Sequence, residues 1–108
     1  MKLITKKQSE QLIEQFSDDY PRPIVRIFSP ISQASWLVYA QCPWNDDILY
    51  ALCDLGMGEP ELGPVSLWEL ESVQSPLPLE RDLHFEATGT VKEYAEAARK
   101  HRRITVDL

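Results

Sequence analysis

The fold is decided by one stretch, Ser35-Trp-Leu-Val-Tyr-Ala-Gln-Cys42, Pro43-Trp-Asn-Asp-Asp47 and Ile48-Leu-Tyr-Ala-Leu-Cys-Asp-Leu55. Its first and third parts are rich in aromatic and aliphatic residues with a period near two, which is typical of strands. The part between them has the composition and length of a hairpin turn. We therefore predict two antiparallel strands at 35–42 and 48–55.

The register of this hairpin follows if Cys42 faces Ile48. One face then carries Trp36, Val38 and Ala40 together with Asp54, Leu52 and Tyr50. The other face carries Leu37 and Tyr39 together with Cys53 and Ala51. Because both faces are largely apolar, we expect the hairpin to be central and covered on both sides.

The same register bears on the two cysteines. Cys53 would lie opposite Leu37, roughly 16 Å from Cys42 at the usual rise of a strand. A disulfide needs Cα atoms within about 7 Å. We therefore expect two free thiols, and their spacing is not that of a CxxC motif.

Helices are predicted on both sides of the hairpin. Three Ser/Thr-x-x-Glu/Gln patterns mark helix starts, because these side chains satisfy free amide groups there. They are Thr5 with Gln8, Ser66 with Glu69, and Thr90 with Glu93. They predict helices at about 6–16, 67–74 and 91–101, the last with Val91, Tyr94, Ala95 and Ala98 on one face.

The remaining strands are shorter. We predict them at about 24–28, 62–65 and 80–85, with a possible short strand at 104–108. Pro64 cannot donate to a ladder, so it indicates an edge strand or a strand end. The fold class is α+β, a single domain over 1–108 in which an antiparallel sheet of four to five strands packs against two to three helices.

Composition limits the function. A chain of 108 residues, 44% hydrophobic, supports one core, and its net charge is −6. Ten acidic residues and one basic residue, Arg81, give the block 36–90 a charge of −9. This acidity disfavours a general nucleic-acid binder. No apolar run approaches the ~18 residues of a membrane span, and no signal peptide is evident, so we expect a soluble cytoplasmic protein.

Common enzyme motifs are missing from the sequence. It contains no GxxxxGK[ST], GxGxxG, GxSxG or HExxH pattern, and only His84 and His101 could serve a histidine-based triad. We assign no catalytic residue, no metal ligand and no cofactor on this basis.

The most unusual segment is the acidic glycine loop at 54–63, which contains Asp54, Glu59 and Glu61. One interpretation is a carboxylate site for a hard cation such as Mg²⁺ or Ca²⁺. The other is a solvated loop that joins two strands, and this is the interpretation we favour.

A second candidate group lies in the predicted strand at 80–85. Asp82, His84 and Glu86 alternate, so they would share one face and suit a metal or acid–base role. The simpler interpretation is the solvated face of an edge strand. Arg81 is then expected to form an internal salt bridge with Asp82, with Glu80 or with the acidic glycine loop.

Two further features concern partners. The basic cluster Arg99-Lys100-His101-Arg102-Arg103 is either a phosphate contact or a favourable placement of cations at a helix C-terminus, and we favour the second. Trp36 is expected in the core, whereas Trp44 and Trp68 fall on a turn and on a capped helix. If both are exposed, they suggest a protein-binding surface.

Three segments resemble a bacterial family of unknown function, domain of unknown function 2958. They are Cys53-Asp-Leu-Gly-Met-Gly-Glu-Pro-Glu-Leu-Gly63, Val65-Ser-Leu67 with Glu69-Leu-Glu71, and Leu79-Glu-Arg-Asp-Leu-His-Phe85. The resemblance implies a small soluble protein, often encoded on plasmids and other mobile elements, with no assigned reaction. This chain departs from the family pattern at Pro64, where a strand former is usual, and in its basic tail after Tyr94.

These observations lead to three hypotheses. The first is a non-enzymatic accessory protein that binds a basic protein partner through an acidic surface built from 54–61 and 80–86. Its candidate binding residues are Asp54, Glu59, Glu61, Arg81, Asp82 and His84. The alternative is a metal-dependent enzyme or metal-binding protein, which requires Asp54, Glu59, Glu61, Asp82 and His84 to converge. The third is nucleic-acid contact through Arg99, Lys100, Arg102 and Arg103; the sequence does not define an oligomeric state.

Overall fold

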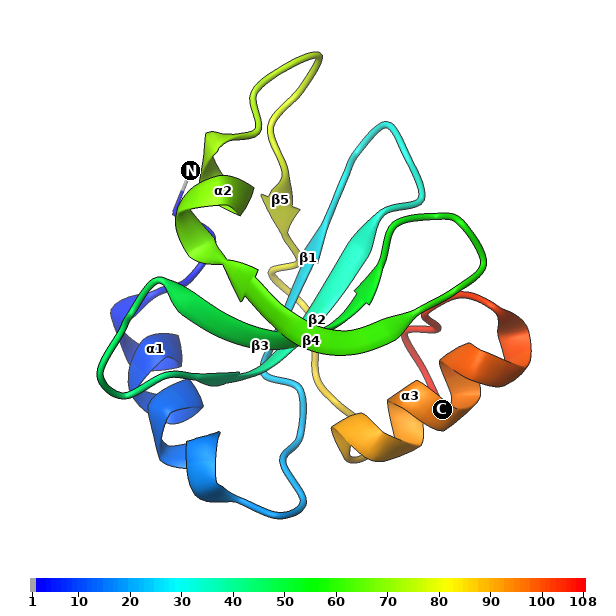
Figure 1. Ribbon diagram of the computed structural model, residues 1–108. Helices are drawn as coiled ribbons and strands as arrows, with labels where there is room; N and C mark the ends of the chain where they lie inside the picture. Colours follow the sequence, from blue (N-terminus) through cyan, green and yellow to red (C-terminus); the bar gives the residue numbers. More distant parts are fainter. Residues whose placement is uncertain (1) are drawn as a thin grey trace.

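The computed structural model describes residues 2–108, which form a five-stranded antiparallel sheet and three α-helices (Figure 1). In chain order the elements are α1 (Lys6–Glu14), a 3-10 turn η1 (Gln15–Ser17), β1 (Val25–Phe28), β2 (Ser35–Gln41), β3 (Ile48–Asp54), β4 (Glu61–Ser66), α2 (Leu67–Ser72), β5 (Glu80–Arg81) and α3 (Val91–His101). The strand order is β4-β3-β2-β1-β5. The predicted α+β class is confirmed.

The β2–β3 hairpin lies inside the sheet, as predicted, with β1 and β4 on either side. Its closing bond is donated by the Cys42 amide to the Ile48 carbonyl, at 3.0 Å. In the turn, the Asn45 side chain accepts from the Asp47 amide at 3.1 Å, which is the local bond that makes asparagine common in turns.

The predicted register holds only next to this turn. Ala40 faces Tyr50 as expected, but the register shifts between Val38 and Ala40, so that Trp36 faces Cys53 instead of Asp54. Tyr39 is the additional residue of a β-bulge, and an additional residue exchanges the faces of everything beyond it. The prediction that Cys53 faces Leu37, and the face assignments from 35 to 38, were therefore wrong.

Each face of the sheet has its own apolar core. On one face Trp36, Val38 and Leu49 pack with residues of α1 and α2, including Leu12 and Leu70. On the other face Leu37 and Leu52 pack against α3 through Val91, Tyr94, Ala95 and Ala98. The expectation that the hairpin is covered on both sides is confirmed.

The helices begin where the capping patterns place them. Thr5 and Thr90 form complete capping boxes, and the Ser66 hydroxyl accepts from the Glu69 amide at 3.1 Å. α3 spans the predicted residues, while α2 ends at Ser72, earlier than expected. Arg102 follows α3 in the left-handed conformation, with φ of 60°, and ends the helix.

The outer strands differ from the predictions. β4 is regular in spite of Pro64, whereas β5 has only two residues and the tail 104–108 forms no strand. The chain turns after β5 because Asp82 Oδ1 accepts from the His84 amide at 2.9 Å. The strand predicted at 80–85 was therefore too long, and the short strand predicted at 104–108 is absent.

Two expectations about the rest of the chain can be compared with the structure. Cys42 and Cys53 are free thiols, as predicted. Across residues 2–108 no helix has both the length and the apolar character needed to cross a bilayer.

Candidate binding surfaces

The acidic glycine loop starts with a carboxylate that is used internally. Asp54 is only 3% exposed. Its Oδ1 accepts from the Gly56 amide at 2.8 Å, and its Oδ2 accepts from the Ile104 amide at 3.0 Å. Asp54 therefore holds the loop and the segment after α3 in place.

The rest of that loop faces the basic end of α3. Glu59 and Glu61 line an open cavity of about 440 Å³ together with Arg99 and Arg102. Arg102 Nε also donates to the Gly58 carbonyl at 3.3 Å. The acidic glycine loop and the basic cluster thus lie against each other, although Gly58 and Arg102 are 44 residues apart in sequence. Lys100 is exposed, and Arg103 lines a separate cavity with Arg26 and Asp54.

The segment around β5 is held by an arginine that sequence reasoning missed. Arg26 of β1 forms an ion pair with Asp82, 3.2 Å between Nη1 and Oδ2, and its guanidinium lies over the Phe28 ring at 4.7 Å. Arg81 instead donates to the Lys2 carbonyl at 3.0 Å, so the salt bridge predicted for Arg81 was wrong. The sequence did contain a signal for Arg26, because a charged residue between the apolar residues Val25 and Ile27 of a strand is expected to need a partner.

The candidate residues do not form one site. The loop 54–61 joins β3 to the edge strand β4, while Asp82 and His84 follow β5 at the other edge of the sheet. Within residues 2–108 there is no group of three His, Cys, Asp or Glu side chains able to hold a metal ion. The convergence required by the metal hypothesis is absent from this part of the chain.

Cys53 has the wrong chemistry for a nucleophile. Burial, and then the nearby Glu61 carboxylate, raise the pKa of the Cys53 thiol to about 11. A thiol with so high a pKa is protonated at neutral pH, and it is the thiolate that reacts.

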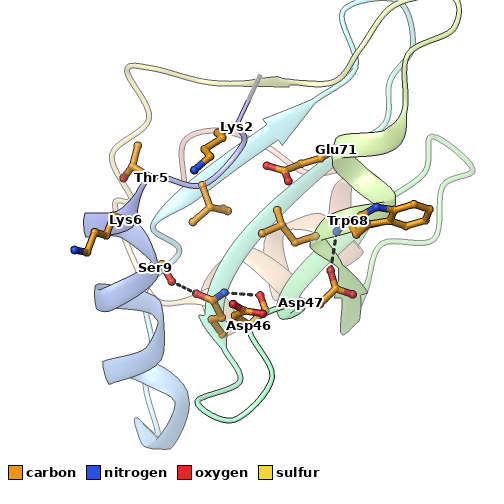
Figure 2. Close-up of a pocket in the computed structure, with 11 residues that line it drawn as sticks. Lys2, Thr5, Lys6, Ser9, Asp46, Asp47, Trp68 and Glu71 are labelled. Atoms are coloured by element: carbon orange, nitrogen blue, oxygen red, sulfur yellow. Dashed lines mark hydrogen bonds between the residues drawn. The ribbon is translucent and has the colours of Figure 1, made fainter.

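A groove of about 420 Å³ separates the start of α1 from α2 (Figure 2). In the view of Figure 2, Thr5, Lys6 and Ser9 stand on one wall, Trp68 and Glu71 on the other, and Asp46 and Asp47 at the lower end. Lys2 and Glu71 lie at the upper end. The groove therefore has both charges on its walls, and Ile4 and Leu67 add apolar surface.

The lower end of the groove is fixed by Gln41, which is 2% exposed. Its Oε1 accepts from the Ser9 hydroxyl, and its Nε2 donates to the Asp46 carbonyl at 2.6 Å. A buried amide with both ends paired holds its neighbours in defined positions. Sequence reasoning missed Gln41, although a glutamine in an otherwise apolar strand was a visible signal.

Asp47 ties the β2–β3 turn to α2. Its Oδ1 accepts from the Trp68 amide at 2.8 Å and its Oδ2 from the Ser66 hydroxyl at 2.7 Å. The Trp68 amide, and then the Ser66 hydroxyl, lower the pKa of the Asp47 carboxyl below its ordinary value. Asp47 therefore remains ionised at neutral pH.

The elements joined by Asp47 carry two exposed tryptophans. Trp44 in the turn is 78% exposed and Trp68 in α2 is 70% exposed, whereas Trp36 is in the core. The two elements also carry four carboxylates. We use the term turn–helix surface for Trp44, Asp46, Asp47, Trp68, Glu69 and Glu71.

Comparison with known families bears on this geometry. The model of the family "Protein of unknown function (DUF2958)" matches residues 3–105. The chain belongs to this family. Neither a curated protein nor a solved structure matches it significantly.

The DUF2958 match extends from the segment before α1 to the segment after α3, so both the acidic glycine loop and the turn–helix surface lie inside it. The family description assigns no reaction and no ligand. A function for this member must therefore be argued from its own surface chemistry.

Proposed function

We propose that this DUF2958 protein is a non-enzymatic protein-binding module that holds a basic segment of a partner protein on the turn–helix surface. The observation that carries the proposal is the exposure of Trp44 and Trp68, at 78% and 70%, on two elements that Asp47 joins. Tryptophan is enriched among the residues that dominate binding energy in protein interfaces.

The charges of the surface favour a basic partner. Asp46 and Glu69 are exposed beside the tryptophans, and Asp47 and Glu71 are partly exposed. An arginine or lysine of a partner can contact an indole face and a carboxylate at once, and partial removal of water strengthens both contacts. Lys2 and Lys6 on the far wall of the groove favour an acidic group next to the basic one, which would orient the segment.

This surface supports the proposal better than the acidic surface expected from the sequence. Glu59 and Glu61 share their cavity with Arg99 and Arg102, and Asp82 is paired with Arg26. In residues 2–108 the Arg26–Asp82 contact is the one ion pair present, so no carboxylate of the turn–helix surface is neutralised in that way. The exposed carboxylates of Asp46 and Glu69 can therefore steer a basic partner, which makes association faster and sensitive to salt. The Asp47 carboxylate already accepts from Trp68 and Ser66, and Glu71 Oε2 accepts from the Leu3 amide at 3.0 Å.

The proposal includes a setting for the partner. A cytoplasmic bacterial protein carried by mobile elements would meet basic, nucleic-acid-handling proteins, and an acidic module could inhibit or modulate one of them. The support is the net charge of −6 together with the family resemblance described from the sequence.

The test is affinity capture from a bacterial lysate at low and at moderate salt, with four baits. These are the wild type, Trp68→Ala, Glu69→Gln, and Glu96→Gln as a matched control on the exposed side of α3. Alanine is a good helix former at an exposed position, so Trp68→Ala is expected to fold.

We expect a basic protein that is retained by the wild type and by Glu96→Gln, is lost with Trp68→Ala, and is weakened by Glu69→Gln and by salt. The proposal is wrong if every captured protein is retained equally by Trp68→Ala and by the control.

A further inference from the structure

Four aromatic side chains, from η1, β2, the turn and β3, gather near the turn end of the β2–β3 hairpin. We call Phe16, Tyr39, Trp44 and Tyr50 the aromatic surface. The Phe16 ring meets the Trp44 ring edge-on, with centroids 5.2 Å apart and an interplanar angle of 77°. It also packs against the Tyr50 ring, with centroids 5.7 Å apart.

The β-bulge hollows this surface. Because of the bulge at Tyr39, both Tyr39 and the small Ala40 line the same open hollow, together with Phe16 and Tyr50. The hollow measures about 320 Å³. A bulge that re-aims a side chain next to a binding site is a recurrent arrangement.

The hollow is held rigidly. The Gln15 side-chain amide donates to the Tyr39 carbonyl at 2.7 Å and to the Arg22 carbonyl at 2.9 Å, which fixes η1 and Phe16 against the bulge. A preformed surface loses little entropy when a ligand binds.

Tyr39 and Tyr50 add hydrogen-bond donors to the rings. Both are half-buried. In the described chain, Arg26 Nε is the one buried side-chain polar atom that has no partner, so neither phenol is a buried orphan group. Across residues 2–108 neither hydroxyl has a protein hydrogen-bond partner, which leaves both available to a ligand that occupies the hollow.

We propose that the aromatic surface binds a proline-rich segment of the partner in the polyproline II conformation. The inference rests on the proposed function, because it names the segment that the basic partner presents. A polyproline II helix has no internal hydrogen bonds, so its carbonyl groups can accept from tyrosine hydroxyls while its proline rings pack on aromatic faces.

The position of Asp46 adds a charge requirement. Asp46 is exposed and follows Trp44 by two residues in the same turn. Because the Trp44 ring contacts Phe16 of the hollow, a proline-rich segment that continues past Trp44 would bring a basic end residue toward the Asp46 carboxylate. The ligand is therefore a proline-rich segment that ends in arginine or lysine.

An aromatic cage for a methylated ammonium group fits the geometry less well. A cage surrounds its cation with ring faces that are separated from one another. Here the Phe16 ring already packs against the Trp44 and Tyr50 rings, so three of the four rings are in contact with one another instead of standing apart around a cation.

The experiment is a titration of the labelled protein, followed by the amide resonances of its spectrum. The first probe is a synthetic peptide of alternating proline and leucine that ends in arginine. The second probe is the same peptide with every proline replaced by glycine. We expect shifts concentrated at Phe16, Tyr39, Trp44 and Tyr50, and affinity about tenfold weaker for the glycine peptide, because the flexible chain loses more entropy.

Variants test the individual contacts. Tyr50→Phe keeps the ring and removes only the hydroxyl, so affinity for the proline peptide is expected to fall about fivefold. Trp44→Ala is expected to lower it about tenfold or more. Glu96→Gln, on the exposed side of α3 and outside both surfaces, is expected to leave the binding of this peptide unchanged.

The outcomes separate the two proposals. Equal affinity for the proline and glycine peptides, or no binding of either, overturns the proline inference, while the lysate experiment with Trp68→Ala still decides the proposed function. Shifts at the same amides with a trimethylammonium compound but not with the proline peptide would also overturn it, in favour of a cage.

Discussion

Gly56 and Gly58 adopt φ values of +82° and +79°, in the left-handed region. Residues with a Cβ are disfavoured there by about 1–2 kcal/mol. These two positions let the acidic glycine loop turn so that Asp54 can accept from the Gly56 amide and Arg102 can reach the Gly58 carbonyl. Gly63 has no such requirement, and nothing lies within 4 Å of the place where its Cβ would be.

We predict that Gly56→Ala lowers the free energy of unfolding by about 1–2 kcal/mol, because alanine must adopt a positive φ. The new Cβ would lie 3.4 Å from the Gln33 Cβ, in van der Waals contact, so the cost comes from the backbone and not from a clash. Gly63→Ala is the matched control and is expected to be neutral or slightly stabilising. Urea unfolding measures both, and equal losses in the two variants would contradict the prediction.

Asp47 predicts a pH dependence. Its pKa in the folded protein is below the ordinary 3.8, so its contribution to stability is complete above pH 3.8 and is lost as the pH falls through the lower folded value. Asp47→Ala removes both hydrogen bonds of the carboxylate and should lower the melting temperature at pH 7.

The difference in melting temperature between wild type and Asp47→Ala should shrink as the pH falls below 3.8. Thermal unfolding across the acidic range measures it. Asp46→Asn is the control, because it removes one negative charge from the same turn, as Asp47→Ala does. A difference that stays constant with pH would show that the carboxylate charge is not responsible.

At the scale of single elements, β4 shows how an exposed edge is protected. The Leu67 amide donates to the Asp47 carbonyl, so the alternate residues Val65, Gly63 and Glu61 bond to β3. The backbone of Pro64 therefore faces outward, where a proline removes a donor from the free edge without breaking the ladder. This explains why the departure from the family pattern at Pro64 does not disrupt the strand.

We predict that Pro64→Val promotes self-association, because it restores a donor in the middle of an exposed edge strand. In sedimentation velocity at increasing protein concentration, the sedimentation coefficient of Pro64→Val should rise more steeply than that of the wild type. Pro78→Val, in the exposed connector before β5, is the control for added hydrophobicity. The same behaviour in both variants would argue against a role for the edge.

The elements differ in how well sequence predicts them. The starts of α1, α2 and α3 follow from local capping, in which the bonding atoms are three residues apart. The bulge at Tyr39 could not be predicted, because a strand pattern of alternating residues does not reveal an additional residue. The bulge had a large consequence. It placed Trp36 and Leu37 on the faces opposite to those predicted, and it brought Tyr39 and Ala40 into the same hollow of the aromatic surface.

At the scale of the whole molecule, Tyr94 joins the end of the chain to the core beneath α3. Its hydroxyl accepts from the Thr88 amide at 3.0 Å and donates to the Val106 carbonyl at 3.1 Å. The ring itself is buried with Leu37 and Leu52 of the sheet. The tail is thus held by a side chain and not by the strand expected at 104–108.

We predict that Tyr94→Phe lowers the free energy of unfolding by about 1–2 kcal/mol, because it leaves partly buried backbone groups without their partner. Urea unfolding measures the loss. Tyr20→Phe, at an exposed position, is the matched control and should change little. A loss no greater than that of the control would mean that the tail does not depend on this hydroxyl.

By itself, the sequence determined the α+β class, the central hairpin, the helix starts and the net negative charge, because each follows from neighbouring residues or from a sum over the chain. Only the tertiary structure decided which charges meet. It placed Arg102 against the acidic glycine loop, paired Arg26 with Asp82 in place of Arg81, and left the turn–helix surface without an ion pair in the described residues. The reason is physical: ion pairs and binding surfaces depend on distances between residues far apart in sequence, and a single additional residue in one strand alters those distances.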